Sequence, residues 1–204
     1  RKGDRLRLCH GRSSLRPPSL ADAARILRDP AVARVLFAGA LHWVTLAPYH
    51  TFFGAHLEHH GGGPMVIGLS IAVAVAVELA VMATAPRWLA SLDPRRVLVV
   101  STGVGVLRWS LTAVGSPAVI VAAQALHGLS YGAFYLSMVD SVVRRTSPEH
   151  RATAQALVSS LALGIGTFAG NLLAGPLYDV DQGRTLFLAA AAFSLVSMAA
   201  ASRT

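Results

Sequence analysis

Three side chains that carry charge or exchange protons lie inside long apolar segments of the chain. They are Glu78, Arg108 and His127. A charged group in the hydrocarbon core of a bilayer is costly, so it normally faces the interior of a helix bundle and marks a path for protons, ions or solute. An imidazole titrates near neutral pH and can pass protons, whereas a guanidinium holds a fixed positive charge. These residue types therefore predict proton-linked movement of a solute.

The depths of Glu78 and Arg108 in the membrane match. Glu78 stands nine residues before Arg87, which places it about 13 Å deep at a helical rise of about 1.5 Å per residue. Arg108 stands about 11 residues inside the next segment, or about 16 Å deep by the same rise. We expect an ion pair between them, direct or bridged by solute, because pairing relieves the burial of both charges. The alternative is a purely structural pair that locks two helices together.

A polar and aromatic stripe follows in segment 118–143. Gln124, His127, Tyr131 and Tyr135 are spaced three, four and four residues apart, so on an α-helix they share one face. Such a face inside a membrane should line a water-filled cavity or the bundle interior. We expect it to contact solute, with hydrogen bonding to neighbouring helices as the alternative.

Three more polar residues are candidates for the same pathway. His42 and His50 lie inside the first apolar segment, and Asn171 lies near the end of the fifth. His42 and His50 would extend the cavity, with hydrogen-bonded packing as the alternative for each. Asn171 would bind solute or cap a neighbouring helix.

Apolar blocks separated by short polar turns must position these side chains. The chain of 204 residues is 53% hydrophobic and only 14% charged, whereas soluble domains carry roughly 25% charged residues. About 20 mainly apolar residues suffice to cross a bilayer as a helix. The pattern predicts an all-α membrane protein with transmembrane helices at 33–56, 65–85, 97–114, 118–143, 152–177 and 184–201.

Residues 1–30 precede this bundle of residues 31–204. They are basic and too polar for a signal peptide, and they predict a cytoplasmic linker with a short surface helix at 20–29. The sequence starts at Arg1, so we expect a further segment upstream.

The positions of the basic residues predict orientation. Nine of the 18 Lys and Arg residues lie at or before Arg34, and most others fall in loops 86–96 and 144–151, whereas the opposite loops hold only Arg184. Cytoplasmic loops carry the excess of Lys and Arg. Both termini are therefore expected in the cytoplasm of a bacterial cell, with the bundle in the inner membrane.

Small residues recur at four-residue spacing in two segments. Gly128 and Gly132 form one such pair, and Ala162, Gly166, Gly170 and Ala174 form a longer series. Such spacing lets helix backbones approach closely in lipid. We expect helix contacts at these positions.

Other functions lack a signal. The formal net charge of +8 follows membrane topology rather than a nucleic-acid surface, and the single Cys9 excludes an intrachain disulfide. No nucleophile elbow, metalloprotease or phosphate-loop motif occurs, so no enzyme activity or cofactor is expected. The run 56–60 (HLEHH) invites a metal site, but a solvated loop is the favoured interpretation.

A set of short motifs occurs in order along the chain: Leu27-Arg28-Asp29-Pro30, Glu78, the segment 86–96 (PRWLASLDPRR), Leu107-Arg108-Trp109, the segment 124–132 (QALHGLSYG), the segment 151–155 (RATAQ) and the segment 175–179 (GPLYD). Together they resemble the C-terminal half of major facilitator superfamily transporters, in the branch of phenylpropionate permeases and nucleoside–proton symporters. The resemblance covers about residues 25–204.

This resemblance implies twelve helices in two halves with solute bound between them. It also implies that Glu78, Arg108, Gln124, His127 and Tyr131 line the central cavity, while Tyr135 stands where permease relatives often have His. The expected function is proton-coupled transport of a small organic solute. The lipid bilayer and either an N-terminal six-helix half or a homodimer mate would be partners, and nucleic acid would not. The alternative is a non-transporting membrane scaffold, assembly subunit or remnant.

Overall fold

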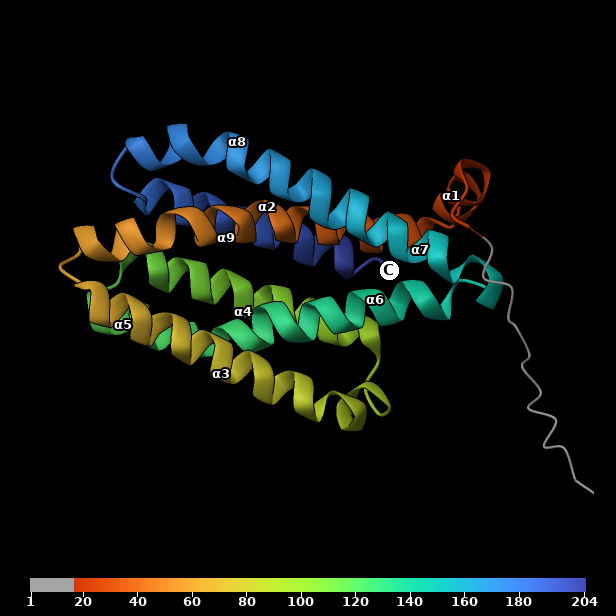
Figure 1. The fold of residues 1–204 in the computed structure, drawn as a ribbon, viewed down its shortest axis with the longest axis horizontal. Helices are drawn as coiled ribbons and strands as arrows, with labels where there is room; N and C mark the ends of the chain where they lie inside the picture. The colour runs from red at the N-terminus through yellow and green to blue at the C-terminus, as the bar shows by residue number, and fades with distance from the viewer. Residues whose placement is uncertain (1–16) are drawn as a thin grey trace, which may run out of the picture.

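The computed structural model describes residues 17–204, so Cys9 and most of the expected linker lie outside the described part. Within residues 17–204, six helices are long and apolar enough to cross a membrane, which confirms the predicted all-α class. They lie side by side along the long axis of the molecule (Figure 1). The elements are α1 (Leu20–Leu27), α2 (Pro30–His59), α3 (Pro64–Leu89), α4 (Pro94–Val114), α5 (Pro117–Ala123), η1 (Gln124–Leu126), η2 (Gly128–Ala133), α6 (Phe134–Arg144), η3 (Pro148–His150), α7 (Arg151–Leu157), η4 (Val158–Ile165), α8 (Gly166–Asp179) and α9 (Arg184–Ala201).

Two of the six spans are built from several elements. Elements α5 to α6 form one continuous span, Pro117–Arg144, and η3 to α8 form another, Pro148–Asp179. The first contains a 3₁₀ turn, η1, followed by a π-helical segment, η2, and the second contains the π-helical segment η4. The sequence pattern predicts both spans as helices, as found, but gives no indication of these irregular segments. π-Helical turns inside α-helices are frequent at functional sites.

Proline and aspartate fix where the spans begin. Pro30 and Pro94 occupy the first turns of α2 and α4, where a missing N–H is harmless. The Asp29 carboxylate accepts a hydrogen bond from the Ala31 amide at 2.8 Å, and Asp93 caps α4 in the same way. Each cap satisfies one of the amide groups that a helix start leaves unpaired.

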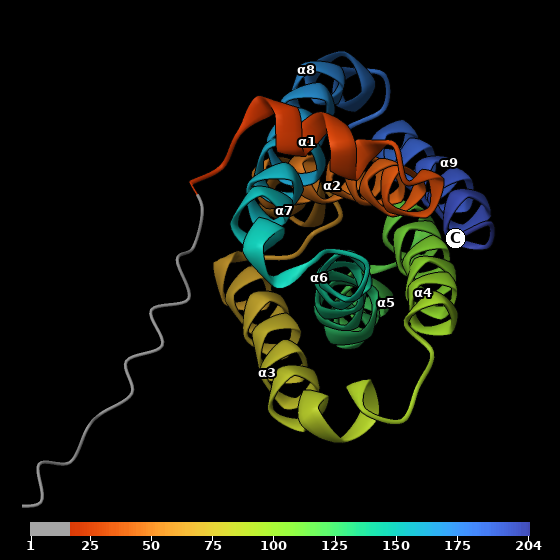
Figure 2. The ribbon, with the colours of Figure 1, turned by 90° about the vertical axis from the view of Figure 1, so that its right-hand side faces the viewer.

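Seen along the helix axes, the span formed by α5 and α6 lies between α3 and α4, with α2 above it (Figure 2). The principal helix contacts are those of α4 with α9, of α2 with both α8 and α9, and of α3 with η2. Buried side chains form two clusters. One surrounds Phe134 and Met138, and the other surrounds Trp109 and Phe187.

Glycines bring α8 directly onto α2. A Cβ atom added at Gly166 would lie 2.5 Å from the Ala40 carbonyl oxygen, and one added at Gly170 would lie 2.5 Å from the Val44 oxygen. Larger residues would therefore force the two backbones apart. This confirms the helix contact that the small-residue series predicted.

The outer surface of the bundle is apolar. Leu69, Leu107 and Phe168 are 56%, 52% and 72% exposed. Helix α3 is the least buried of the spans and also the most hydrophobic, with a mean hydropathy of 2.4 in its most apolar window. Lipid tails solvate such side chains, so this exposure fits a protein embedded in a bilayer.

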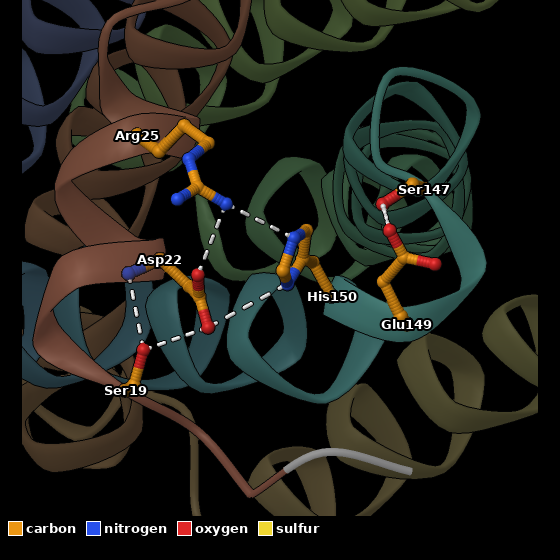
Figure 3. Close-up of polar contacts among 6 residues, drawn as sticks. All are labelled: Ser19, Asp22, Arg25, Ser147, Glu149 and His150. Atoms are coloured by element: carbon orange, nitrogen blue, oxygen red, sulfur yellow. Dashed lines mark hydrogen bonds and ion pairs between the residues drawn. The ribbon is translucent and has the colours of Figure 1, made fainter. Parts of the chain in front are cut away.

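Helix α1 is fastened to the turn that precedes α7, at the end of the bundle that carries the basic loops (Figure 3). We call this end the basic end. Asp22 is only 4% exposed. Its carboxylate lies 3.6 Å from His150 Nδ1 and 3.3 Å from the Arg25 guanidinium, which in turn lies 3.3 Å from His150 Nε2. Ser19 caps the helix through the Asp22 amide. These contacts hold the entry to the bundle against η3 and α7.

Candidate functional site

Glu78 pairs with His127 in the middle of the bundle. Glu78 Oε2 on α3 lies 3.3 Å from His127 Nε2, next to η2. The imidazole is 6% exposed and the carboxylate side chain 22%, so the pair is largely withdrawn from the surface. The direct ion pair expected between Glu78 and Arg108 is wrong, because among the described residues Glu78 contacts His127 and Arg108 contacts Gln124; a contact bridged by solute stays a prediction. Their matched depth did not decide which side chains meet, since rotation about each helix axis also matters.

Gly128 explains how Glu78 reaches His127. A Cβ atom at Gly128 would lie 2.6 Å from the Val77 carbonyl carbon and 2.8 Å from the Glu78 amide nitrogen. Helix α3 therefore lies directly on the backbone of η2. The close approach at Gly128 confirms the helix contact that the pair of small residues predicted.

Arg108 is fully buried and has no carboxylate partner within the described chain. Its guanidinium carbon lies 4.4 Å from the centre of the Tyr49 ring and 4.2 Å from that of Trp109. One guanidinium N–H donates to Gln124 Oε1 at 3.0 Å. The Gln124 amide donates in turn to the Ile120 carbonyl oxygen at 2.9 Å. Aromatic faces and one amide thus hold this positive charge, because ring quadrupoles attract cations.

A cleft of about 300 Å³ opens between α2 and α3 beside the Glu78–His127 pair. Its polar lining comes from that pair together with Tyr49, His50 and Thr51 on α2. Phe53 and Gly54 of α2 and apolar residues of α3, including two isoleucines, form the rest of the wall. We refer to it as the central cleft. A mostly apolar hollow with a few convergent polar groups is typical of small-molecule sites.

Tyr49 is the residue that sequence reasoning missed. It is 5% exposed, lies against Arg108 and contacts the His127 ring with centroids 5.8 Å apart. Its position directly after Pro48 and before His50 is the one local hint. Its contact with Arg108 depends on how α2 packs against α4, so the sequence alone does not predict it.

The aromatic stripe forms a column of rings. His127 stacks on Tyr131 at 5.3 Å, and Tyr131 on Tyr135 at 6.2 Å, counted between ring centroids. Neither tyrosine lines the central cleft. Tyr131 also meets the edge of Trp43 at 5.7 Å. The column extends from the cleft toward the basic end, past η2 into α6.

The two remaining candidates lie apart from the cleft wall. His42 is 2% exposed and stacks on Phe134, with ring centroids 4.1 Å apart, inside the bundle. Asn171 is exposed on α8, and its Oδ1 lies 3.5 Å from the Thr51 hydroxyl. Because Thr51 lines the central cleft, Asn171 stands at its edge.

Several buried nitrogen atoms in the bundle interior lack a hydrogen-bond partner among the described residues. They belong to His42 (Nε2), Arg108 (Nε), Trp109 (Nε1) and His127 (Nδ1). An unpaired buried polar atom is costly, by about 1–3 kcal/mol. The bundle centre therefore offers hydrogen-bonding capacity that the protein itself does not use.

His56 of α2 contacts α4 and the turn before α9, at the end of the bundle opposite the basic end. Its Nδ1 lies 2.9 Å from the Gln182 carbonyl oxygen and its Nε2 lies 2.9 Å from that of Thr112. The interpretation of 56–60 as a solvated loop is wrong, because α2 continues to His59 and the His56 side chain is fully buried. Gly183, with φ of +107°, packs so closely that a Cβ there would lie 2.6 Å from His56 Nδ1. The described residues contain no group of three or more His, Cys, Asp or Glu side chains placed to bind a metal ion.

Replacing His56 by alanine is expected to lower the free energy of unfolding by about 3 kcal/mol, since it removes the contacts with the Thr112 and Gln182 carbonyl oxygens and leaves a cavity. Denaturant unfolding of the purified protein measures this. His59→Ala is the matched control, because His59 is exposed three residues away. Equal midpoints for the two variants would contradict the assignment.

The sequence matches the MFS_1 like family, a family of the major facilitator superfamily, over residues 6–189. The chain belongs to this family. An uncharacterised transporter of Bacillus subtilis (strain 168), YwbF, is 26% identical over 142 residues, which are 67% of this chain and 35% of that protein. A crystal structure of a variant of the nucleoside transporter NupG superimposes with a TM-score of 0.78 and 21% identity, over 89% of this chain and 50% of that one.

Membership in the MFS_1 like family agrees with the six candidate membrane spans found among the described residues. The chain spans about half of the solved transporter and about a third of the curated one. Its six spans thus correspond to one half of a major facilitator fold, as the motifs predicted.

Proposed function

We propose that this protein acts as the C-terminal half of a proton-coupled transporter for a small organic solute in the inner membrane of a bacterial cell. The observation that carries the proposal is the Glu78–His127 pair beside the central cleft. A carboxylate and an imidazole in contact share a proton site at membrane depth, which is the chemistry that proton relays use. A second six-helix half, or a second copy of this chain, would supply the opposite wall of the cavity.

In this proposal protonation changes the Glu78–His127 contact. With Glu78 ionised and His127 protonated, the two attract each other and hold α3 against η2. A proton on Glu78 removes that attraction, which frees α3 to move relative to η2. Solute binding would depend on Tyr49 and His127, which line the central cleft, and the fixed charge of Arg108 would act on the solute through the Tyr49 ring that it contacts.

Uptake into vesicles that contain the whole protein tests the proposal. An imposed inward proton gradient should drive accumulation of one member of a panel of radiolabelled nucleosides and aromatic acids; nucleosides are included because NupG is a nucleoside transporter. Glu78→Gln should reduce proton-driven uptake to background while membrane insertion is unchanged. Glu58→Gln is the matched control, because Glu58 is exposed and outside the cleft.

Two outcomes would count against the proposal. Wild-type uptake by Glu78→Gln would remove Glu78 from the coupling mechanism. A lack of gradient-driven uptake for every solute in the panel would favour a scaffold or assembly role.

The proposed orientation has its own test in a background with Cys9 replaced by serine. Ser116→Cys and Ser147→Cys place single thiols in exposed turns at opposite ends of the bundle. A membrane-impermeant maleimide added to intact cells should label Ser116→Cys and leave Ser147→Cys unlabelled until the cells are permeabilised. The reverse pattern would invert the topology.

A further inference from the structure

A second hollow lies on the outside of the bundle, at the basic end. It has a volume of about 360 Å³, within the range of about 300–1,000 Å³ that ligand sites occupy. It lies between α3, α4 and η2 and shares no residue with the central cleft. Its walls are mostly apolar and open outward, with Val100 63% and Leu129 46% exposed. We call it the Arg96 groove, after the charged residue in its lining.

Arg96 supplies a positive charge that the described chain leaves unpaired. Its guanidinium makes no hydrogen bond or ion pair with any residue of 17–204, whereas neighbouring Arg95 donates to the Ser202 carbonyl oxygen. A further hollow of about 500 Å³ meets the first at Arg96 and Val100. The 500 Å³ hollow contains one carboxylate, that of Asp93, which accepts a hydrogen bond from the Arg95 amide as the cap of α4. Arg96 therefore stands between two hollows with its charge available.

Trp88 marks the depth of the groove in the membrane. It lines the groove, and its indole N–H donates to the Val81 carbonyl oxygen at 3.3 Å. Tryptophan is enriched where hydrocarbon meets the lipid headgroups. Trp88 belongs to the last turn of α3, beside the basic loop 86–96. The groove thus begins at headgroup level and continues into the hydrocarbon region.

We propose that the Arg96 groove binds an anionic phospholipid, with one acyl chain along Val100 and Leu129 and the phosphate at Arg96. A basic residue at the mouth of an apolar groove between transmembrane helices matches both parts of such a lipid. A water-soluble apolar ligand would have to reach the groove through the bilayer, where lipid is already present at high concentration. Occupancy would brace α3 three residues from Glu78, since Val81 forms part of the wall.

Native mass spectrometry of the full chain in detergent tests the headgroup contact. Phosphatidylglycerol should remain bound, and phosphatidylcholine with the same chains should bind more weakly. Arg96→Gln should weaken phosphatidylglycerol binding about fivefold, as expected for one basic residue at a membrane surface. Arg145→Gln is the matched control, because Arg145 is exposed in the other basic loop. Equal losses in both variants, or equal binding of the two lipids, would overturn the proposal.

Fluorescence quenching tests separately whether an acyl chain lies in the Arg96 groove. Phosphatidylglycerol with brominated chains should quench the protein in membranes, and part of that quenching should disappear in Trp88→Phe and decrease in Val100→Phe, which fills the groove. Inorganic phosphate should not relieve the quenching, because the acyl chain in the groove holds the lipid in place even when free phosphate competes for Arg96. Quenching that is the same in wild type and Trp88→Phe would show that the bound chains lie elsewhere.

Discussion

An Arg108→Met variant is expected to lose uptake completely while the bundle stays as resistant to unfolding as the wild type, or becomes more resistant. Arg108 is fully buried without a carboxylate partner in the described chain. Moving a charge out of water costs several kcal/mol, and the faces of Tyr49 and Trp109 return about 0.5–2 kcal/mol each. An apolar side chain of similar length avoids the desolvation cost. We therefore expect this charge to contribute to the proposed transport rather than to folding.

Arg108→Met also removes the hydrogen-bond donor of Gln124, so a matched double variant is needed to separate this loss from the loss of the charge. In Arg108→Met the Gln124 Oε1 atom loses its donor, and a buried unpaired acceptor costs about 1–3 kcal/mol. Arg108→Met combined with Gln124→Leu removes both partners and should be close to neutral or stabilising. Uptake assays and denaturant midpoints on the single and double variants separate the two effects. A double variant that unfolds far more readily than wild type would assign Arg108 a structural role.

A Gly128→Ala variant is expected to lose about 1–3 kcal/mol of stability and most of its proton-driven uptake. The added methyl group would lie 2.6 Å from both the carbonyl carbon and the oxygen of Val77. These are backbone atoms, so no side-chain rotation relieves the overlap, and α3 must move away from η2. The magnitude follows from the cost of overpacking a well-packed contact. Because Glu78 belongs to the displaced backbone, its contact with His127 should lengthen at the same time.

Gly132→Ala is the control for this prediction. It makes the same chemical change on the same helix pair, but the added methyl group would lie 3.6 Å from the nearest side-chain atoms, Glu78 Cγ and Val81 Cγ1, which is an ordinary contact. Thermal unfolding and vesicle uptake should leave Gly132→Ala close to wild type. Similar losses in both variants would show that the close backbone approach at Gly128 is not what positions Glu78.

The sequence alone determined the spans and many of their contacts. The spans follow because a bilayer requires about 20 apolar residues per helix, a local property of composition. The helix contacts at Gly128, Gly166 and Gly170 follow because only small residues let backbones approach in lipid. The presence of Glu78, Arg108 and His127 inside apolar segments was equally plain. Each of these inferences depends on residues close together in the chain.

The tertiary structure alone decided which buried groups meet. Depth along a helix can be counted from the sequence, but rotation about its axis is set by packing, so Glu78 contacts His127 rather than Arg108. The 3₁₀ and π-helical turns at η1 and η2 also change the angle between successive side chains, which a regular period of 3.6 residues does not anticipate. The place of Arg108 between Tyr49 and Trp109 depends on α2 and α4, which are distant in sequence. Pairing in the bundle centre is therefore a property of helix packing, whereas burial of those residues in the membrane is a property of the sequence.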